Sequence, residues 1–168
     1  VDQNIIWICQ LPRSGGTLML RLLDSHPQIH GYPAVFGFNT RHRIWPEPAE
    51  ISGSADLLGD IFSYMDLGKF HGVGIRKQSS NMEQQRYPIY FNEEWYRGIF
   101  HASLKGNSPR DSFNAFFTAL FNAWHNYQNL YGEKKYITGQ MTLRFPEKYS
   151  ENFRNFKAVY PTGKMLFM

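Results

Sequence analysis

The amino-acid sequence predicts a three-layer α/β domain, with a central parallel sheet and helices on both faces. Short apolar runs with β-branched or aromatic residues lie at 5–9, 135–139 and 164–168, and each is typical of a buried strand. A glycine turn and a Leu/Met-rich helical pattern follow the first run, and another helical pattern separates the last two. Strands that alternate with helices in this way indicate a parallel sheet.

Composition limits the classes of function. With 168 residues, 19% charged and 17% aromatic, the chain can form one domain (1–168) with a sizeable core and is not disordered. Its net charge of +4 suits an anionic ligand but is too small and scattered to predict nucleic-acid binding. The single cysteine, Cys9, excludes an internal disulfide, and we expect it to be a small buried hydrophobe.

No apolar run approaches the roughly 20 residues that cross a bilayer, so we expect no membrane span within the chain. We expect a cytoplasmic location, and the start at Val1 leaves a removed signal or anchor open.

The stretch after the first strand predicts an anion-binding loop. The chain breaks at Pro12, passes Gly15 and Gly16, and continues as a helical pattern that stops at His26-Pro27, because proline disfavours helical geometry in the residue before it. Strand, glycine turn and helix together direct free backbone N–H groups and the positive end of the helix dipole into the turn. The alternative is an ordinary turn with Arg13 in solvent.

The loop lacks the lysine of the nucleotide-triphosphate P-loop, G-x-x-x-x-G-K-[ST]. Aligned on Thr17, the chain has Gln10 for the first glycine and Gly16 for the lysine. Its cation comes earlier, at Arg13, and is a guanidinium suited to bidentate contact with an anion.

Residues 12–18, followed by Leu-Leu-Asp-Ser-His-Pro at 22–27, resemble the sulfotransferase family that uses 3′-phosphoadenosine-5′-phosphosulfate (PAPS), especially its bacterial and tyrosylprotein-type members. The resemblance implies a P-loop-like fold and metal-free transfer of a sulfuryl group to a hydroxyl or amine of a small molecule, carbohydrate or peptide. It makes Arg13 catalytic. It also implies that the cofactor contacts come from Pro12, Arg13, Ser14, Gly15, Gly16, Thr17 and Leu18. One departure lies inside the loop, where Gly16 stands in the place of the first threonine that most members have.

Residues 28–33 are expected to form a short extended segment that ends in a turn at Pro33. Within it, His30 is a second catalytic candidate. Tyrosylprotein-type members have a Gly-Glu at this place, and the Glu is the general base, whereas Tyr32 follows Gly31 here. His30 lies one residue earlier and can take a proton at neutral pH. The alternative is a packed or solvated histidine.

Residues 36–108 have weak periodicity and many glycines and prolines, with short helices expected near 55–65 and 92–104. The resemblance makes this a variable acceptor-binding region or lid, whose rings could stack on an acceptor. The alternative is that these rings form a satellite core. They are Trp45, Tyr87, Tyr90, Phe91, Trp95 and Tyr96.

Two later helices are predicted. The sequence Ser-Pro-Arg-Asp at 108–111 combines an N-cap, a proline at the first helical position and an acid at the third. Aromatic residues then recur at helical spacing as far as Tyr131, and a second ring-faced helix begins at Pro146 and ends before 161–163. The aromatic face of the first helix comprises Phe113, Phe116, Phe117, Leu120, Phe121, Trp124 and Tyr131.

The end of the chain departs from the family. Gln140 stands where members often have a lysine, and no arginine or serine follows the strand at 164–168, where the family binds the 3′-phosphate. We therefore expect an incomplete domain, truncated before the 3′-phosphate motif. The alternatives are a divergent P-loop kinase or NTPase and a non-catalytic nucleotide- or anion-binding module. The oligomeric state is not predicted.

Overall fold

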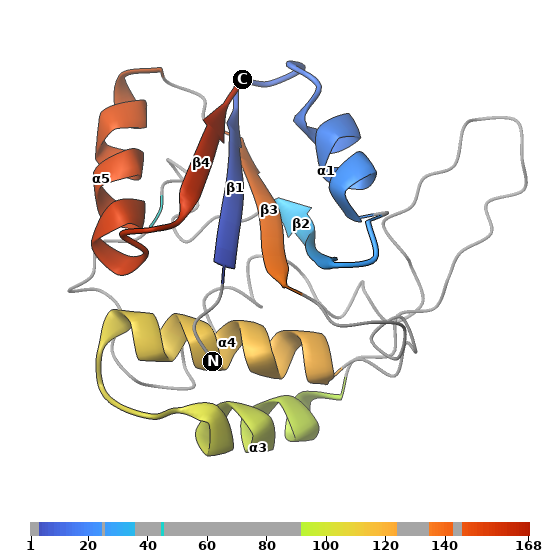
Figure 1. Cartoon of the computed structure of the whole chain (residues 1–168), viewed down its shortest axis with the longest axis vertical. Coiled ribbons are helices and arrows are strands. Elements are labelled where there is room, and N and C mark those ends of the chain that lie inside the picture. The colour runs from blue at the N-terminus through green and yellow to red at the C-terminus, as the bar shows by residue number, and fades with distance from the viewer. Residues whose placement is uncertain (1–3, 25, 36–44, 46–91, 124–134, 143–145) are drawn as a thin grey trace, which may run out of the picture.

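A computed structural model describes residues 4–24, 26–35, 45, 92–123, 135–142 and 146–168. Its centre is a four-stranded, all-parallel sheet in the order β2-β3-β1-β4 (Figure 1). The predicted α/β class with a parallel sheet is confirmed. The strands are β1 (Asn4–Gln10), β2 (Ile29–Val35), β3 (Tyr136–Thr142) and β4 (Lys164–Phe167).

Strand β1 is central because it is apolar on both faces. It pairs with β3 on one side and β4 on the other, and Trp7, Ile8 and Cys9 are fully buried. Burial raises the pKa of the Cys9 thiol to about 12, so the cysteine is the inert apolar residue that the sequence predicts.

Strand β2 extends past Pro33, where the sequence predicts a turn. Its pairing with β3 is irregular between Gly31 and Val35, and it is an edge strand, the place in a sheet where proline is tolerated. The turn before it is fixed locally, because the Asp24 carboxylate accepts the Gly31 N–H at 3.1 Å and His26 Nδ1 accepts the Gln28 N–H at 3.2 Å.

Helices lie on both faces of the sheet. Successive β1 side chains point to opposite faces of the sheet, so Cys9 lies on one face and Gln10 lies on the other. Gly16 packs on Gln10, whereas Asn152 donates a hydrogen bond to Cys9 Sγ. Helix α1 (Gly16–Asp24) therefore lies on one face and α5 (Tyr149–Val159) on the other, after the short 3₁₀ helix η4 (Pro146–Lys148) (Figure 1).

Helix α4 (Pro109–Asn122) begins as predicted. Ser108 Oγ accepts the Asp111 N–H at 3.1 Å, and the Asp111 carboxylate accepts the Ser108 N–H at 3.2 Å, which completes a capping box. The helix ends before the predicted 131, with Ala123 as its C-cap; residues 124–134 lie outside the described part. The Ala123 carbonyl accepts the N–H of Asn92, the N-cap of α3 (Glu93–Ser103), so the two helices pack as a pair.

Aromatic rings fill the space between the sheet and the helices α4 and α5. Trp45 lies at the centre, with its ring 5.1 Å from Trp7 and 5.1 Å from Phe156 in edge-to-face geometry. Asn152 Oδ1 accepts the Trp45 N–H at 2.6 Å, and Asn155 Nδ2 donates to the Trp45 carbonyl at 3.0 Å, so α5 binds its backbone as well.

Among the rings that were candidates either for stacking on an acceptor or for a core, Trp45 and Tyr96 belong to the core, and Trp95 is half exposed. The helix expected at 55–65 and the rings of Tyr87, Tyr90 and Phe91 lie outside the described residues. None of the helices that the structure describes is long and apolar enough to cross a bilayer.

Candidate functional site

The connections after the two central strands leave the sheet on opposite sides. The chain passes from β1 to α1 on one face, and from β3 through η4 to α5 on the other. In an open α/β sheet, such a divergence creates a crevice outside the carboxyl ends of the strands, where ligands bind. Gln10 and Thr142 stand at these ends and pair in register.

The loop after β1 has an unusual backbone. Arg13 has a φ of 69° and Gly15 a φ of 94°, and both values lie in the left-handed region. The Ser14 N–H and Oγ–H both donate to the Leu11 carbonyl, at 3.2 and 2.9 Å, and close the turn. A left-handed conformation costs a non-glycine residue roughly 1–2 kcal/mol. Residues that are held in such a strained conformation are often found at functional sites.

The first turn of α1 presents three N–H groups without a partner in the described part of the chain. Leu18 and Met19 donate to the Gly15 carbonyl at 2.9 and 3.0 Å, whereas no acceptor among the described residues takes the N–H of Gly15, Gly16 or Thr17. These groups carry the positive end of the helix dipole. They border an open pocket of about 310 Å³, which is lined by Gln10, Arg13, Gly15, Gly16, Thr17 and Thr142.

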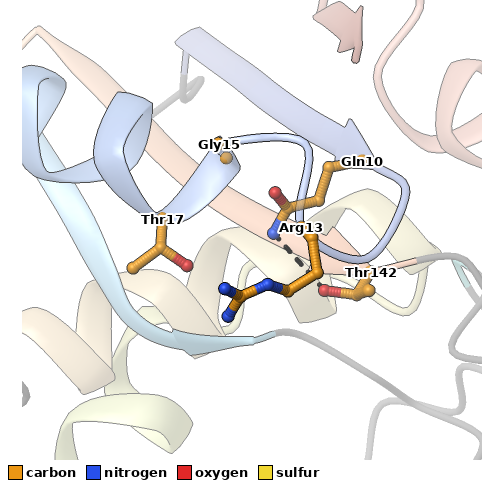
Figure 2. Close-up of a pocket in the computed structure, with 6 residues that line it drawn as sticks. Gln10, Arg13, Gly15, Thr17 and Thr142 are labelled. Carbon is orange, nitrogen blue, oxygen red and sulfur yellow. Dashed lines mark hydrogen bonds between the residues drawn. The ribbon is translucent and has the colours of Figure 1, made fainter.

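Figure 2 shows the Arg13 guanidinium and the Thr17 hydroxyl directed toward the same space, beside the Gln10 amide. Thr17 Oγ1 lies 3.5 Å from Gln140 Oε1, which is the long limit of a hydrogen bond. One exposed guanidinium, one hydroxyl and three N–H groups are the kinds of donor that a tetrahedral oxyanion can accept hydrogen bonds from.

The predicted cofactor residues therefore divide into two groups. Arg13, Gly15, Gly16 and Thr17 line the pocket. Pro12 and Ser14 lie in the turn beside it, and the Leu18 side chain is 64% exposed and does not line the pocket.

Sequence reasoning noted Gln10 and Gln140 only as departures from family patterns, and missed their contact beneath the loop. Gln10 Nε2 donates to Gln140 Oε1 at 2.9 Å and to Thr142 Oγ1 at 3.4 Å, and both glutamines are 95% buried. Their signal in the sequence was a polar residue near the carboxyl end of an otherwise apolar strand.

The structure does not bring His30 to the loop. His30 of β2 pairs with Ile137 of β3, and Ile137 pairs in turn with Ile5 of β1. Ile5 lies five residues before Gln10, the last residue of β1. At about 3.3 Å per residue, this is roughly 16 Å from the carboxyl end of the strand. The imidazole stacks on Phe121 of α4, with the ring centroids 4.4 Å apart, so the alternative of a packed histidine describes its surroundings.

No protein-family model, curated protein or solved structure matches the chain. The likeness to sulfotransferases therefore rests on the sequence of the loop and of the turn after α1.

Proposed function

We propose that the protein is a sulfotransferase that moves a sulfuryl group from PAPS to a hydroxyl or amine, on a P-loop-like fold. The observation that carries the proposal is the loop at the end of β1, where the cation is Arg13, held in a left-handed conformation at the pocket. The central position of β1, whose loop leads directly into α1, supports a P-loop-like arrangement.

In this proposal the N–H groups of Gly15, Gly16 and Thr17 hold the 5′-phosphate of PAPS. The Thr17 hydroxyl exchanges its long contact with Gln140 for a phosphate oxygen. Arg13 lies at the pocket and neutralises charge on the oxygen that bridges phosphorus and sulfur. The sulfuryl group is already highly charged, so positioning and charge stabilisation supply most of the catalysis.

The transfer breaks the bond between sulfur and the bridging oxygen and forms a bond from sulfur to the acceptor oxygen or nitrogen. Adenosine 3′,5′-bisphosphate leaves with the bridging oxygen and its electron pair. The acceptor also loses a proton, which the proposal assigns to no side chain, because no residue that lines the described pocket is a carboxylate or imidazole.

The packing at Gly16 argues against a kinase or NTPase. A β-carbon at this position would collide with the buried side-chain amide of Gln10. The lysine that contacts the outer phosphates in a P-loop stands at this position, so the loop as folded has no room for it.

Calorimetric titration of the full-length protein with PAPS, adenosine 3′,5′-bisphosphate and ATP–Mg²⁺ tests the proposal, together with an assay for bisphosphate released from PAPS. We expect the first two ligands to bind more tightly than ATP–Mg²⁺, and release to depend on an added acceptor. Preferential binding of ATP–Mg²⁺ would support a kinase or NTPase instead. Binding of PAPS without release in the presence of a broad acceptor panel would support a non-catalytic module.

A further inference from the structure

The Gln10 side chain is held in one place beneath the loop. It leaves the end of β1 on the α1 face, is 95% buried, and donates both amide hydrogens to β3. One goes to Gln140 Oε1 at 2.9 Å, and the other goes to Thr142 Oγ1 at 3.4 Å (Figure 2 shows the contact with Thr142). With both hydrogens directed to β3, Oε1 is left facing the start of α1. Any movement of this buried amide breaks these hydrogen bonds. The movement is costly in free energy, because a buried donor that loses its partner is left unsatisfied.

The start of α1 rests directly on this amide. A β-carbon on Gly16 would overlap Gln10 Oε1 and Cδ, whereas a β-carbon on Gly15 would meet no atom within 4 Å. The two glycines are therefore required for different reasons. Gly15 has a left-handed φ of 94°, and Gly16 has a close neighbour.

Gln10 also reaches the ligand-facing side of the turn through Gln140. The Gln140 Oε1 atom that accepts from Gln10 also lies 3.5 Å from Thr17 Oγ1. The ends of the two central strands and the first turn of the helix are thus joined through side chains. The Gln10 amide both limits how closely α1 approaches the sheet and orients the partner of Thr17.

We infer that Gln10 is a positioning residue for the anion-binding loop, and that it dictates glycine at position 16, where the sulfotransferase resemblance leads one to expect threonine. The amide occupies the space that a side chain at 16 needs, so residues 10 and 16 act as one unit. The effect on PAPS binding rests on the proposed function, whereas the coupling of the two residues does not.

A double-mutant cycle tests this inference. Gly16→Ala should weaken PAPS binding roughly tenfold or more, because its β-carbon overpacks the loop. Adding Gln10→Ala should restore the affinity to within about threefold of Gln10→Ala alone. Titrations are made well below the melting temperature of each variant, so that a loss of stability alone does not change the measured affinity. Melting temperatures without ligand form a second, independent cycle.

Gly15→Ala is the matched control. It adds the same methyl group one residue away, and its cost arises from the left-handed backbone rather than from a collision. We expect Gln10→Ala to give no rescue of Gly15→Ala in either readout. Absence of rescue at 16, or equal rescue at 15 and 16, would overturn the inference. If the unmodified protein does not bind PAPS, the proposed function is wrong. The double-mutant cycle in melting temperature still decides whether Gln10 and Gly16 are coupled.

Discussion

Arg13 has an unfavourable backbone conformation and a charged side chain that lines the pocket. Its backbone is left-handed, with a φ of 69°, and its side chain lines the same pocket as Gly15, Gly16 and Thr17. The conformation carries the chain around the Leu11–Ser14 turn and places a guanidinium beside the start of α1. A glycine would make this turn at lower energy, so the arginine is consistent with a role in binding rather than in stability.

Replacing Arg13 should therefore separate stability from function. Arg13→Ala and Arg13→Gly should both lower the rate of sulfuryl transfer roughly 10²-fold or more, and weaken PAPS more than adenosine 3′,5′-bisphosphate. Arg13→Gly should be more stable to urea than Arg13→Ala by about 1 kcal/mol, because only glycine adopts the left-handed backbone without strain.

Arg21→Ala is the charge control for these variants. Arg21 is exposed in the last turn of α1 and does not line the pocket, so its removal changes the net charge equally but should leave PAPS affinity within about twofold. If Arg21→Ala weakened PAPS as much as Arg13→Ala, Arg13 would act only through net charge.

At the scale of single elements, local signals in the sequence predicted the structure well. The start of α4 was predicted because its cap and its aromatic spacing are local properties, and a short helix was expected near 92–104, where α3 lies. The glycine turn between β1 and α1 was predicted for the same reason. The Gln10–Gln140 contact was not, because it joins residues 130 positions apart in the sequence. The end of strand β2 was misplaced because Pro33 signals a turn unless the strand is known to lie at an edge.

The capping box of α4 makes a direct test at this scale. Ser108→Ala removes the acceptor of the Asp111 N–H, and we expect the free energy of unfolding to fall by about 0.5–2 kcal/mol. Ser150→Ala, at an exposed position in α5, removes the same hydroxyl and should change it by less than about 0.5 kcal/mol. Urea unfolding of the two variants provides the comparison; equal effects would mean that the Ser108 cap does not stabilise α4.

At the scale of the whole molecule, the described core is built around Trp7 and Trp45, whose rings are 5.1 Å apart. The parallel sheet was predictable from the alternation of strands and helices. The strand order and the place of Trp45 at the centre of the core, against Trp7 and α5, were not, because both depend on contacts between residues far apart in the sequence. The same limit explains why His30 looked like a base in the sequence, whereas the sheet places it against Phe121.

Gly139 tests how tightly this core is packed. A β-carbon on Gly139 of β3 would collide with the Trp7 ring, which is fully buried, so Gly139→Ala should lower the free energy of unfolding by about 1–3 kcal/mol. Gly98→Ala is a control with the opposite expected sign, because Gly98 lies at an exposed position in the middle of α3 with open space around it. It should raise stability by about 0.5–1 kcal/mol. Thermal unfolding distinguishes the two; a stabilising Gly139→Ala would contradict the close contact with Trp7.

An NMR titration of the backbone amides most directly tests whether the loop after β1 binds the 5′-phosphosulfate of PAPS without a metal. Spectra of the ¹⁵N-labelled protein are recorded as PAPS is added in excess EDTA. We expect the largest shifts at Gly15, Gly16 and Thr17, whose N–H groups have no acceptor among the described residues, and the same shifts when Mg²⁺ replaces EDTA. Shifts centred elsewhere in the molecule, or shifts at the loop that require Mg²⁺, would contradict this assignment.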